Sequence, residues 1–142
     1  MAAERAANSH LLLGREAEEL AAAHLAAAGA QILLKNYRRR SGELDIVALH
    51  HGVLLIVEVR LRSDSRHGDG AASVDHHKQR KIVSAARQLL QQRRDLARFP
   101  VRFDVIALSR ARACHSATLN RSPANTDRWN IDWLKHAFEA RG

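Results

Sequence analysis

The stretch that decides the fold runs from residue 42 to residue 62: Gly42-Glu-Leu-Asp-Ile-Val-Ala-Leu-His50-His-Gly-Val-Leu-Leu-Ile-Val-Glu-Val-Arg-Leu-Arg62. Apolar and polar side chains alternate along both arms, which is the period of a β-strand. A short turn centred on His51-Gly52 joins the arms, so we expect a hairpin in which residue 50 faces residue 53. That register places Asp45 opposite Glu58 and Glu43 opposite Arg60. It also predicts that Leu44, Ile46 and Ala48 share one face of the first strand.

The two facing acids, Asp45 and Glu58, are the first candidate site. Carboxylates that face each other on adjacent strands repel, whereas a divalent cation between them would turn the repulsion into binding. Carboxylate oxygens suit Mg²⁺ or Mn²⁺, with water and a backbone carbonyl completing the shell. Such an ion activates water and stabilises the charge of a phosphoryl transition state. Arg60 projects from the same face as Glu58, where it would orient water or contact a phosphate.

The composition favours an anionic partner. The 142 residues suggest one domain, and 23 Lys and Arg against 15 Asp and Glu give a net charge of +8. Such a charge attracts polyanions, most simply nucleic acid; the alternative is a solvated basic surface without a specific partner. Cys114 is the only cysteine, which excludes an internal disulfide and is typical of a reducing cytoplasm. The chain lacks an apolar run near the roughly 20 residues of a membrane span, so we expect a cytoplasmic protein.

The rest of the chain predicts an α/β fold: a single small domain with a central mixed β-sheet flanked by helices, in the order α-β-β-β-α-β-α. Gly29 stands where a helix cap belongs, and the helix after the hairpin is expected to serve as a crossover. The loop at 63–72 is either a clamp for a substrate backbone or a plain connector. The remaining expected segments are a disordered terminus at 1–8, a helix at 9–28, a strand at 31–38, a helix at 74–97, a strand at 101–108, a polar loop at 110–130, and a C-terminal helix within 131–142 that packs on the domain at 9–109.

Three further features leave alternatives open. Glu18 lies about a quarter turn from the apolar stripe of its helix, so it is either a solvated carboxylate or an acid at the edge of the buried face. Basic residues at 78–81 crowd a helix N-terminus, where the macrodipole disfavours them; a phosphate backbone is one explanation. The pairs His50-His51 and His76-His77 point their side chains apart and indicate solvated surface rather than a metal site.

Taken together, the motifs form an ordered set that resembles the PD-(D/E)XK nuclease superfamily and, more closely, the YraN-type bacterial family. The resemblance covers about residues 14–109 and the last ten. Each motif alone is weak, and their order carries the resemblance. The motifs are Gly14 with Glu18 and Ala21, Asn36-Tyr37-Arg38, Gly42-Glu43-Leu44-Asp45, Val57-Glu58-Val59-Arg60 with Arg62, Val74 with Lys78-Gln79, Arg102-Phe103-Asp104-Val105, and Trp133 with Ala137-Phe138.

The resemblance implies a restriction-endonuclease-like fold with Asp45 and Glu58 as Mg²⁺ or Mn²⁺ ligands. It also implies the Val59 carbonyl as a further ligand, Glu18 as an additional acid, and Lys78 or Gln79 beside the site. The departure is Arg60, where the superfamily usually has lysine. Arginine stays protonated and cannot act as a base, but it can hold a phosphate. A bridge from Arg60 to Glu43 across the hairpin is the alternative role.

Three functional hypotheses follow. The leading one is a metal-dependent DNA endonuclease that hydrolyses phosphodiester bonds, with branched DNA as a candidate substrate. The second is a nucleic-acid-binding protein that keeps the nuclease-like fold without the chemistry, which Arg60 motivates. The third is an interaction protein, such as a homodimer formed through a sheet edge or the C-terminal helix. The residues expected to contact nucleic acid are Arg38, Arg39, Arg40, Arg62, Lys78 and Gln79.

Overall fold

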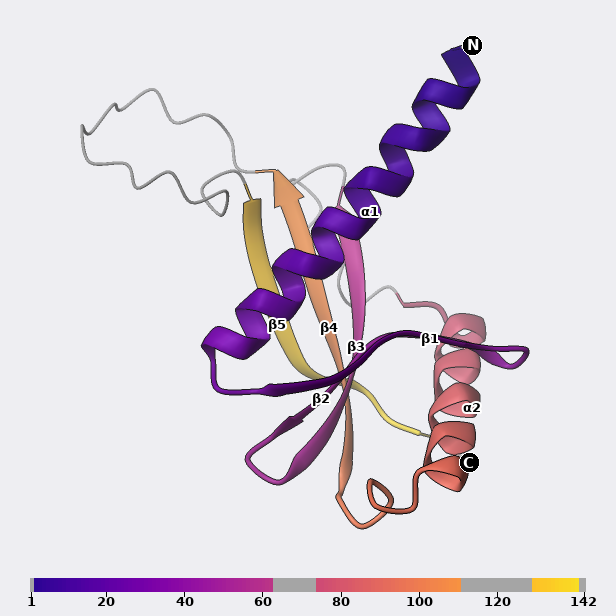
Figure 1. Ribbon diagram of the computed structural model, residues 1–142, viewed down its shortest axis with the longest axis vertical. Helices are drawn as coiled ribbons and strands as arrows, with labels where there is room; N and C mark the ends of the chain where they lie inside the picture. The colour runs from indigo at the N-terminus through magenta and orange to yellow at the C-terminus, as the bar shows by residue number, and fades with distance from the viewer. Residues whose placement is uncertain (1, 63–73, 111–128, 141–142) are drawn as a thin grey trace, which may run out of the picture.

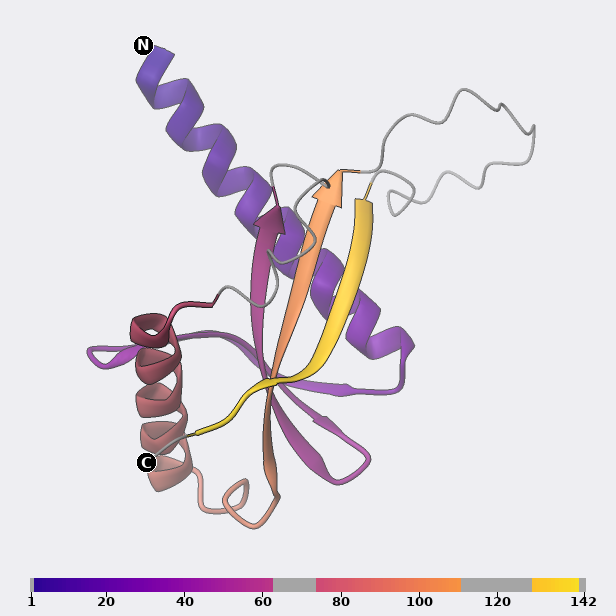
Figure 2. The same ribbon diagram turned by 180° about the vertical axis from the view of Figure 1, so that it is seen from behind.

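The computed structural model describes residues 2–62, 74–110 and 129–140, with side chains from residue 14 onward. A five-stranded sheet has the spatial order β1-β2-β3-β4-β5, and only the β3–β4 pair is parallel. Helix α1 crosses one face of this sheet, and α2 packs on the other (Figures 1 and 2). The elements are α1 (Ala2–Ala27), β1 (Gln31–Arg39), β2 (Gly42–His50), β3 (Val53–Arg62), α2 (His76–Gln92), β4 (Val101–Arg110) and β5 (Trp129–Phe138).

The β2–β3 hairpin has the predicted register. His50 faces Val53, and the ladder continues in step to Ile46 opposite Val57. Both turn residues, His51 and Gly52, have positive φ angles of 51° and 75°, which is the geometry of the two-residue turn that matches strand twist. A glycine at the second position favours that turn, and the turn fixes the register.

The predicted partner of Glu43 is wrong. Glu43 pairs with Arg38 of β1 in the β1–β2 ladder, and Arg38 Nε lies 3.4 Å from Glu43 Oε1. On the other side, the β2–β3 ladder ends before it reaches Glu43. On its β4 side, Arg60 stands opposite Ala107.

Helix α1 covers one face through small residues. Its buried stripe includes Ala17, Ala21 and Leu25, as the alanine-rich pattern predicted. Gly29 has a φ of 95°, and the amide of Ala30 donates to the carbonyl of Leu25 at 3.0 Å, which is the bonding of a glycine-terminated helix end. The helix begins at Ala2, earlier than the predicted start at residue 9; alanine has the highest helix propensity, and residues 2–8 contain several.

Helix α2 covers the other face and forms the crossover between β3 and β4. Asp75 caps it by accepting a hydrogen bond from the Lys78 amide at 2.7 Å. Its buried residues include Ile82 and Leu89, which belong to the same core cluster as Leu54 of β3. The helix ends at Gln92 rather than near residue 97.

The predicted C-terminal helix is wrong: the segment is strand β5, antiparallel to β4. Trp129, Ile131 and Trp133 alternate in sequence and all pack on the α1 side, so the strand period was present in the residues. The fold is therefore α/β with the order α-β-β-β-α-β-β. The predicted loops lie outside the described residues, apart from Arg110 at the end of β4 and residues 129 and 130 in β5; Cys114 also lies outside them.

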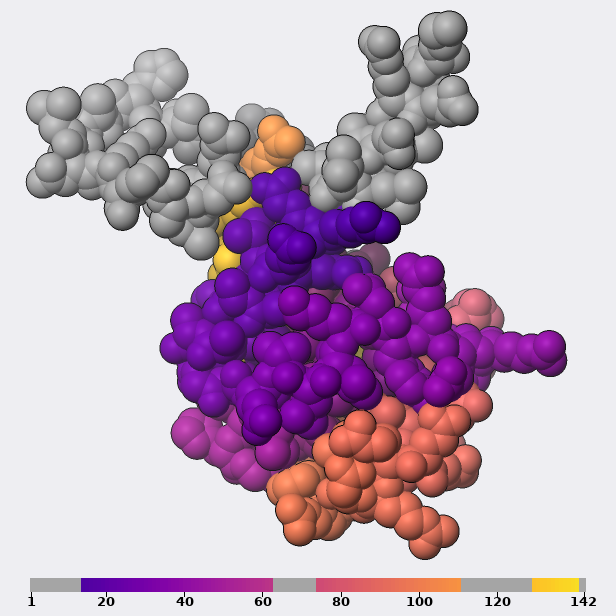
Figure 3. All heavy atoms as spheres, in the orientation of Figure 1, coloured from indigo at the N-terminus to yellow at the C-terminus, as the bar shows by residue number. Residues whose placement is uncertain are grey.

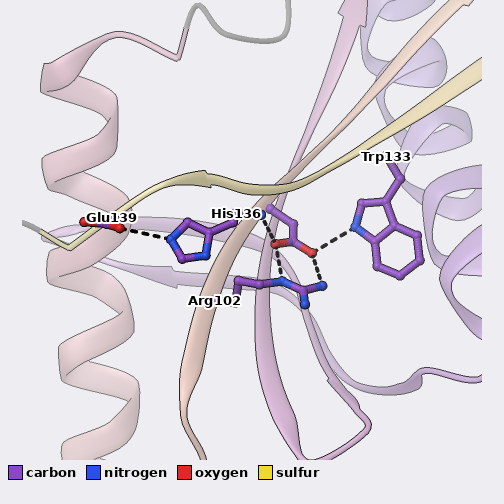
Figure 4. A network of polar contacts seen from close by, with 5 residues as sticks. Arg102, Trp133, His136 and Glu139 are labelled. Carbon is purple, nitrogen blue, oxygen red and sulfur yellow. Dashed lines mark hydrogen bonds and ion pairs between the residues drawn. The ribbon is translucent and has the colours of Figure 1, made fainter.

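A buried carboxylate anchors β5. Asp104 is fully buried, and Arg102 donates two hydrogen bonds to it, each of 2.8 Å. The indole of Trp133 and the backbone amide of His136 each donate to it at 2.9 Å (Figure 4). Burial alone would raise the pKa of Asp104, but these donors outweigh burial and hold its pKa below the ordinary value of 3.8. Neither helix in the described residues combines the length and apolarity needed to cross a bilayer.

Candidate metal and nucleic-acid site

A cavity of about 430 Å³ lies between the β2–β3 hairpin and the first turn of α2. It joins residues that are far apart in sequence, because the crossover returns α2 over the strands. Among the residues predicted to form the site, Asp45, Glu58 and Lys78 line it. The full lining consists of Gly42, Glu43, Asp45, Glu58, Asp75, His77, Lys78, Lys81 and Ile82.

Asp45 meets β3 through its side chain. Beyond the last ladder pair, Asp45 Oδ2 accepts a hydrogen bond from the Val59 amide at 2.9 Å. The neighbouring Glu58 is only 5% exposed, and its charge acts on the Asp45 carboxyl. The predicted convergence of these two acids is therefore present.

A change of face in β2 turns Asp45 toward this cavity. Leu44 packs in the core beneath α2, whereas Ile46 packs in the core beneath α1. The prediction that both share a face is therefore wrong for Leu44. The cause lies across the β1–β2 ladder, where Asn36 has a positive φ of 55° and stands between the partners of Ile46 and Leu44. This break in the pleat allows Leu44 and Ile46 to face opposite sides of the sheet.

Glu58 destabilises the ionised form of Asp45. Burial and then the charge of Glu58 raise the pKa of Asp45 from 3.8 to about 7, against the opposing effects of the Val59 amide and Lys78. Asp45 therefore keeps its proton well above the pH at which an ordinary aspartate ionises. Binding of a cation that neutralises the pair is therefore favourable.

Glu18 approaches the pair from α1. Its pKa is raised, mainly by partial burial, and the charge of Asp45 contributes in the same direction. The Asn36 side chain hydrogen-bonds to Glu18 and opposes the rise. Glu18 therefore lies within electrostatic range of Asp45, although it is not among the residues that line the cavity.

Lys78 provides the positive charge next to the acids. Its Nζ lies 2.5 Å from Glu58 Oε1, and its side chain is 51% exposed. The capping bond from Asp75 holds the backbone of Lys78 in place. A half-exposed ammonium therefore neutralises a nearly buried carboxylate.

The donor set fits Mg²⁺ or Mn²⁺ better than a softer metal. Asp45 and Glu58 offer carboxylate oxygens, which hard cations prefer. Across the ranges 2–62, 74–110 and 129–140, no group of three or more His, Cys, Asp or Glu residues is arranged to hold a metal. Mg²⁺ commonly binds through one or two carboxylates and keeps several waters, so two acids are sufficient for it.

The sequence comparisons identify the family. Residues 17–108, which include both acids and Lys78, match the model of the uncharacterised protein family UPF0102. This chain belongs to that family. A UPF0102 protein of Ectopseudomonas mendocina is 39% identical over 133 residues, covering 94% of this chain and 99% of that protein. Relatives from Stutzerimonas stutzeri and Saccharophagus degradans are 37% and 36% identical, and cover 89% and 91% of this chain and 94% of each relative.

Most cations predicted to contact nucleic acid have partners within this UPF0102 chain. Within the part of the chain that the structure describes, the exception is Arg40, which is exposed in the β1–β2 turn. Arg60 is half-buried and engaged in an interaction of its own. The observed contacts are Arg38 with Glu43, Arg39 with Tyr37 and Gln92, Arg62 with Asp132, Lys78 with Glu58, and the Gln79 side chain with the Val74 carbonyl.

Sequence reasoning missed what positions α2. A Cβ added at Gly42 would lie 2.6 Å from the Lys81 carbonyl oxygen, so only glycine lets the β1–β2 turn lie this close to the helix. Ser41 adds a 2.9 Å hydrogen bond to Gln88, and Figure 3 shows the strands of this turn beside α2. The sequence placed Gly42 at the start of the hairpin, but it held no signal for the helix packed against it.

Sequence reasoning also missed a basic groove on the outer side of α2. A cavity of about 870 Å³ lies between α2 and the end of β5. Arg80 and Arg87 line it on the helix side, and His136 lines it on the strand side. These arginines are two helical turns apart, so the groove presents positive charge on its helix side, whereas Glu139 lines it on the strand side.

Proposed function

We propose that this UPF0102 protein is a metal-dependent DNA endonuclease that hydrolyses phosphodiester bonds, with branched DNA as the substrate class to test first. The observation that carries the proposal is the convergence of Asp45 and Glu58 in a cavity at the N-terminus of α2. The pair is electrostatically unfavourable in the metal-free chain, and it offers the donors that Mg²⁺ and Mn²⁺ prefer.

Asp45 and Glu58 would hold the ion, and the Val59 carbonyl is proposed as a further ligand. When bound, the ion would supply an activated water and charge stabilisation for phosphoryl transfer. Glu18 would add negative charge beneath the pair. Arg60, which projects from the Glu58 side of β3, would orient a phosphate but cannot accept a proton.

The DNA backbone would approach the mouth of the cavity. Arg40 is exposed on the adjoining turn, and the groove with Arg80 and Arg87 extends along the other side of α2. The net charge of +8 supports the same partner. We also propose a cytoplasmic location, as the single cysteine suggests. We further propose a homodimer formed through a sheet edge, which light scattering can test.

The test is incubation of the purified protein with four-way junction, flap and linear DNA in the presence of Mg²⁺ or Mn²⁺. We expect cleavage that EDTA abolishes and that Asp45→Asn and Glu58→Gln each reduce by at least about a hundredfold. Glu43→Gln is the matched control, because Glu43 lines the same cavity but pairs with Arg38. Cleavage that survives Asp45→Asn would come from another nuclease and would refute the proposal.

The second candidate is a nucleic-acid-binding protein without cleavage. Arg60 is the observation that favours it, because a permanently protonated side chain replaces the superfamily's usual lysine. It predicts salt-sensitive DNA binding that Asp45→Asn leaves intact, with no product on any substrate. Binding and cleavage assays on the same samples separate the two candidates.

A further inference from the structure

The Lys78–Glu58 contact joins a side chain that can move to one that cannot. Glu58 is 5% exposed and lies in the middle of the sheet on β3. The Lys78 side chain is 51% exposed and comes from a different element. Asp75 fixes the Lys78 backbone, so the flexible stem alone can carry the ammonium away from Glu58.

We propose that the Lys78 ammonium and a divalent cation are alternative occupants of the Glu58 carboxylate, and that metal binding displaces the lysine toward the mouth of the cavity. This inference rests on the proposed metal site. The Lys78 Nζ lies 2.5 Å from Glu58 Oε1, so a divalent ion bound to the same carboxylate would be repelled by the ammonium. The ion and the ammonium therefore compete for Glu58.

The exchange gives Lys78 two successive roles. Without metal, the ammonium limits the repulsion between Asp45 and Glu58 and keeps the buried carboxylate paired. With metal, the same ammonium stands at the cavity mouth, where a phosphate would meet it. Metal binding would thus strengthen DNA binding, because it releases a positive charge that Glu58 otherwise neutralises.

Lys81 provides a matched comparison. It lines the same cavity, one helical turn further along α2, and it has no ion pair with any other residue in the described part of the chain. Neutralising Lys81 removes the same charge from the same cavity without touching the carboxylate. A difference between the two positions therefore reports competition for Glu58 rather than a general change in charge.

The experiment is calorimetric titration of Mn²⁺ into the metal-free full-length protein at fixed pH and salt. We expect Lys78→Gln to bind Mn²⁺ about tenfold more tightly than the unsubstituted protein, because a charge-assisted hydrogen bond no longer has to be broken. Lys81→Gln should raise the affinity by less than about threefold, the weaker effect of an exposed charge. Lys78→Arg, which keeps the competing cation, should not raise it.

The outcomes separate this inference from the function. Tight Mn²⁺ binding by the unsubstituted protein with unchanged or weaker binding by Lys78→Gln would overturn the exchange and leave the metal site standing. Absence of Mn²⁺ binding in both proteins would overturn both. If Lys78→Gln does not fold, the comparison of Lys78→Arg with Lys81→Gln decides: tighter binding by Lys78→Arg refutes competition, and equal or weaker binding supports it.

Discussion

Replacing Asp45 with asparagine should stabilise the metal-free protein. Asparagine keeps an oxygen that can accept the Val59 amide, and it removes the charge that burial and Glu58 make unfavourable. The rise in the pKa of Asp45 from 3.8 to about 7 corresponds to roughly 4 kcal/mol at about 1.4 kcal/mol per pH unit. We therefore expect a gain of up to about 4 kcal/mol in the free energy of unfolding at pH 8.

The gain depends on pH in a defined direction. Between pH 3.8 and about 7, the folded chain keeps a proton on Asp45 that the unfolded chain has lost, so stability falls as pH rises through this window. The advantage of asparagine should therefore shrink below about 1 kcal/mol at pH 4, where the folded state is protonated and the unfolded state, with its ordinary pKa of 3.8, is only about half ionised.

Urea unfolding in EDTA at pH 4 and pH 8 measures both values. Glu43→Gln is the control, since the Glu43 side chain is 59% exposed and its removal should change stability by less than about 0.5 kcal/mol. An Asp45→Asn protein that is no more stable at pH 8, or equally stabilised at pH 4, would show that the two acids are not held in mutual repulsion.

Further substitutions test the anchor of β5, the packing of the glycines and the basic groove. Asp104→Asn should lower the free energy of unfolding by about 3 kcal/mol at pH 7, measured by urea unfolding, because Arg102 stays half-buried without a counter-charge. The difference should shrink as pH falls below 3.8, because the unsubstituted protein then loses the stabilisation that comes from the lowered pKa of Asp104. Gly42→Ala should destabilise by about 1–3 kcal/mol, whereas Gly14→Ala, with open space around the added carbon, should stabilise α1 by about 0.5–1 kcal/mol. Arg87→Glu should weaken DNA binding and lower the salt slope by about one, measured by fluorescence anisotropy, with the exposed Arg94→Glu as the charge-matched control outside the groove.

The hairpin could be predicted because its information is local. The His51-Gly52 turn fixes the register, and the register brings Asp45 to Glu58. The change of face at Asp45 could not be predicted in this way, because it depends on the backbone of Asn36 in another strand. Asparagine adopts positive φ more often than most residues, but the sequence does not show which asparagine within a strand does so.

Strand β5 was missed for a related reason. Its alternation holds for only three residues that face α1, and it breaks near His136, where φ is 57°. The bonds that hold this irregular part come from Asp104, 32 residues earlier in the chain. Pairing of the basic side chains was equally hidden, since Arg39 meets Gln92 only because α2 returns across the sheet.

Two of the contacts that assemble the cavity do not involve its acids. Gly42 lies against the Lys81 carbonyl, and Ser41 bonds to Gln88, so the β1–β2 turn and α2 are held together by groups away from the carboxylates. Those contacts keep Asp45 beside Glu58 although the two repel. This repulsion makes the metal-free fold less stable. A cation that neutralises the pair, whether the ammonium of Lys78 or a divalent ion, removes that cost, and its binding is favoured by the same amount. An acid whose removal stabilises the fold, as predicted for Asp45, is better explained by ligand binding than by folding.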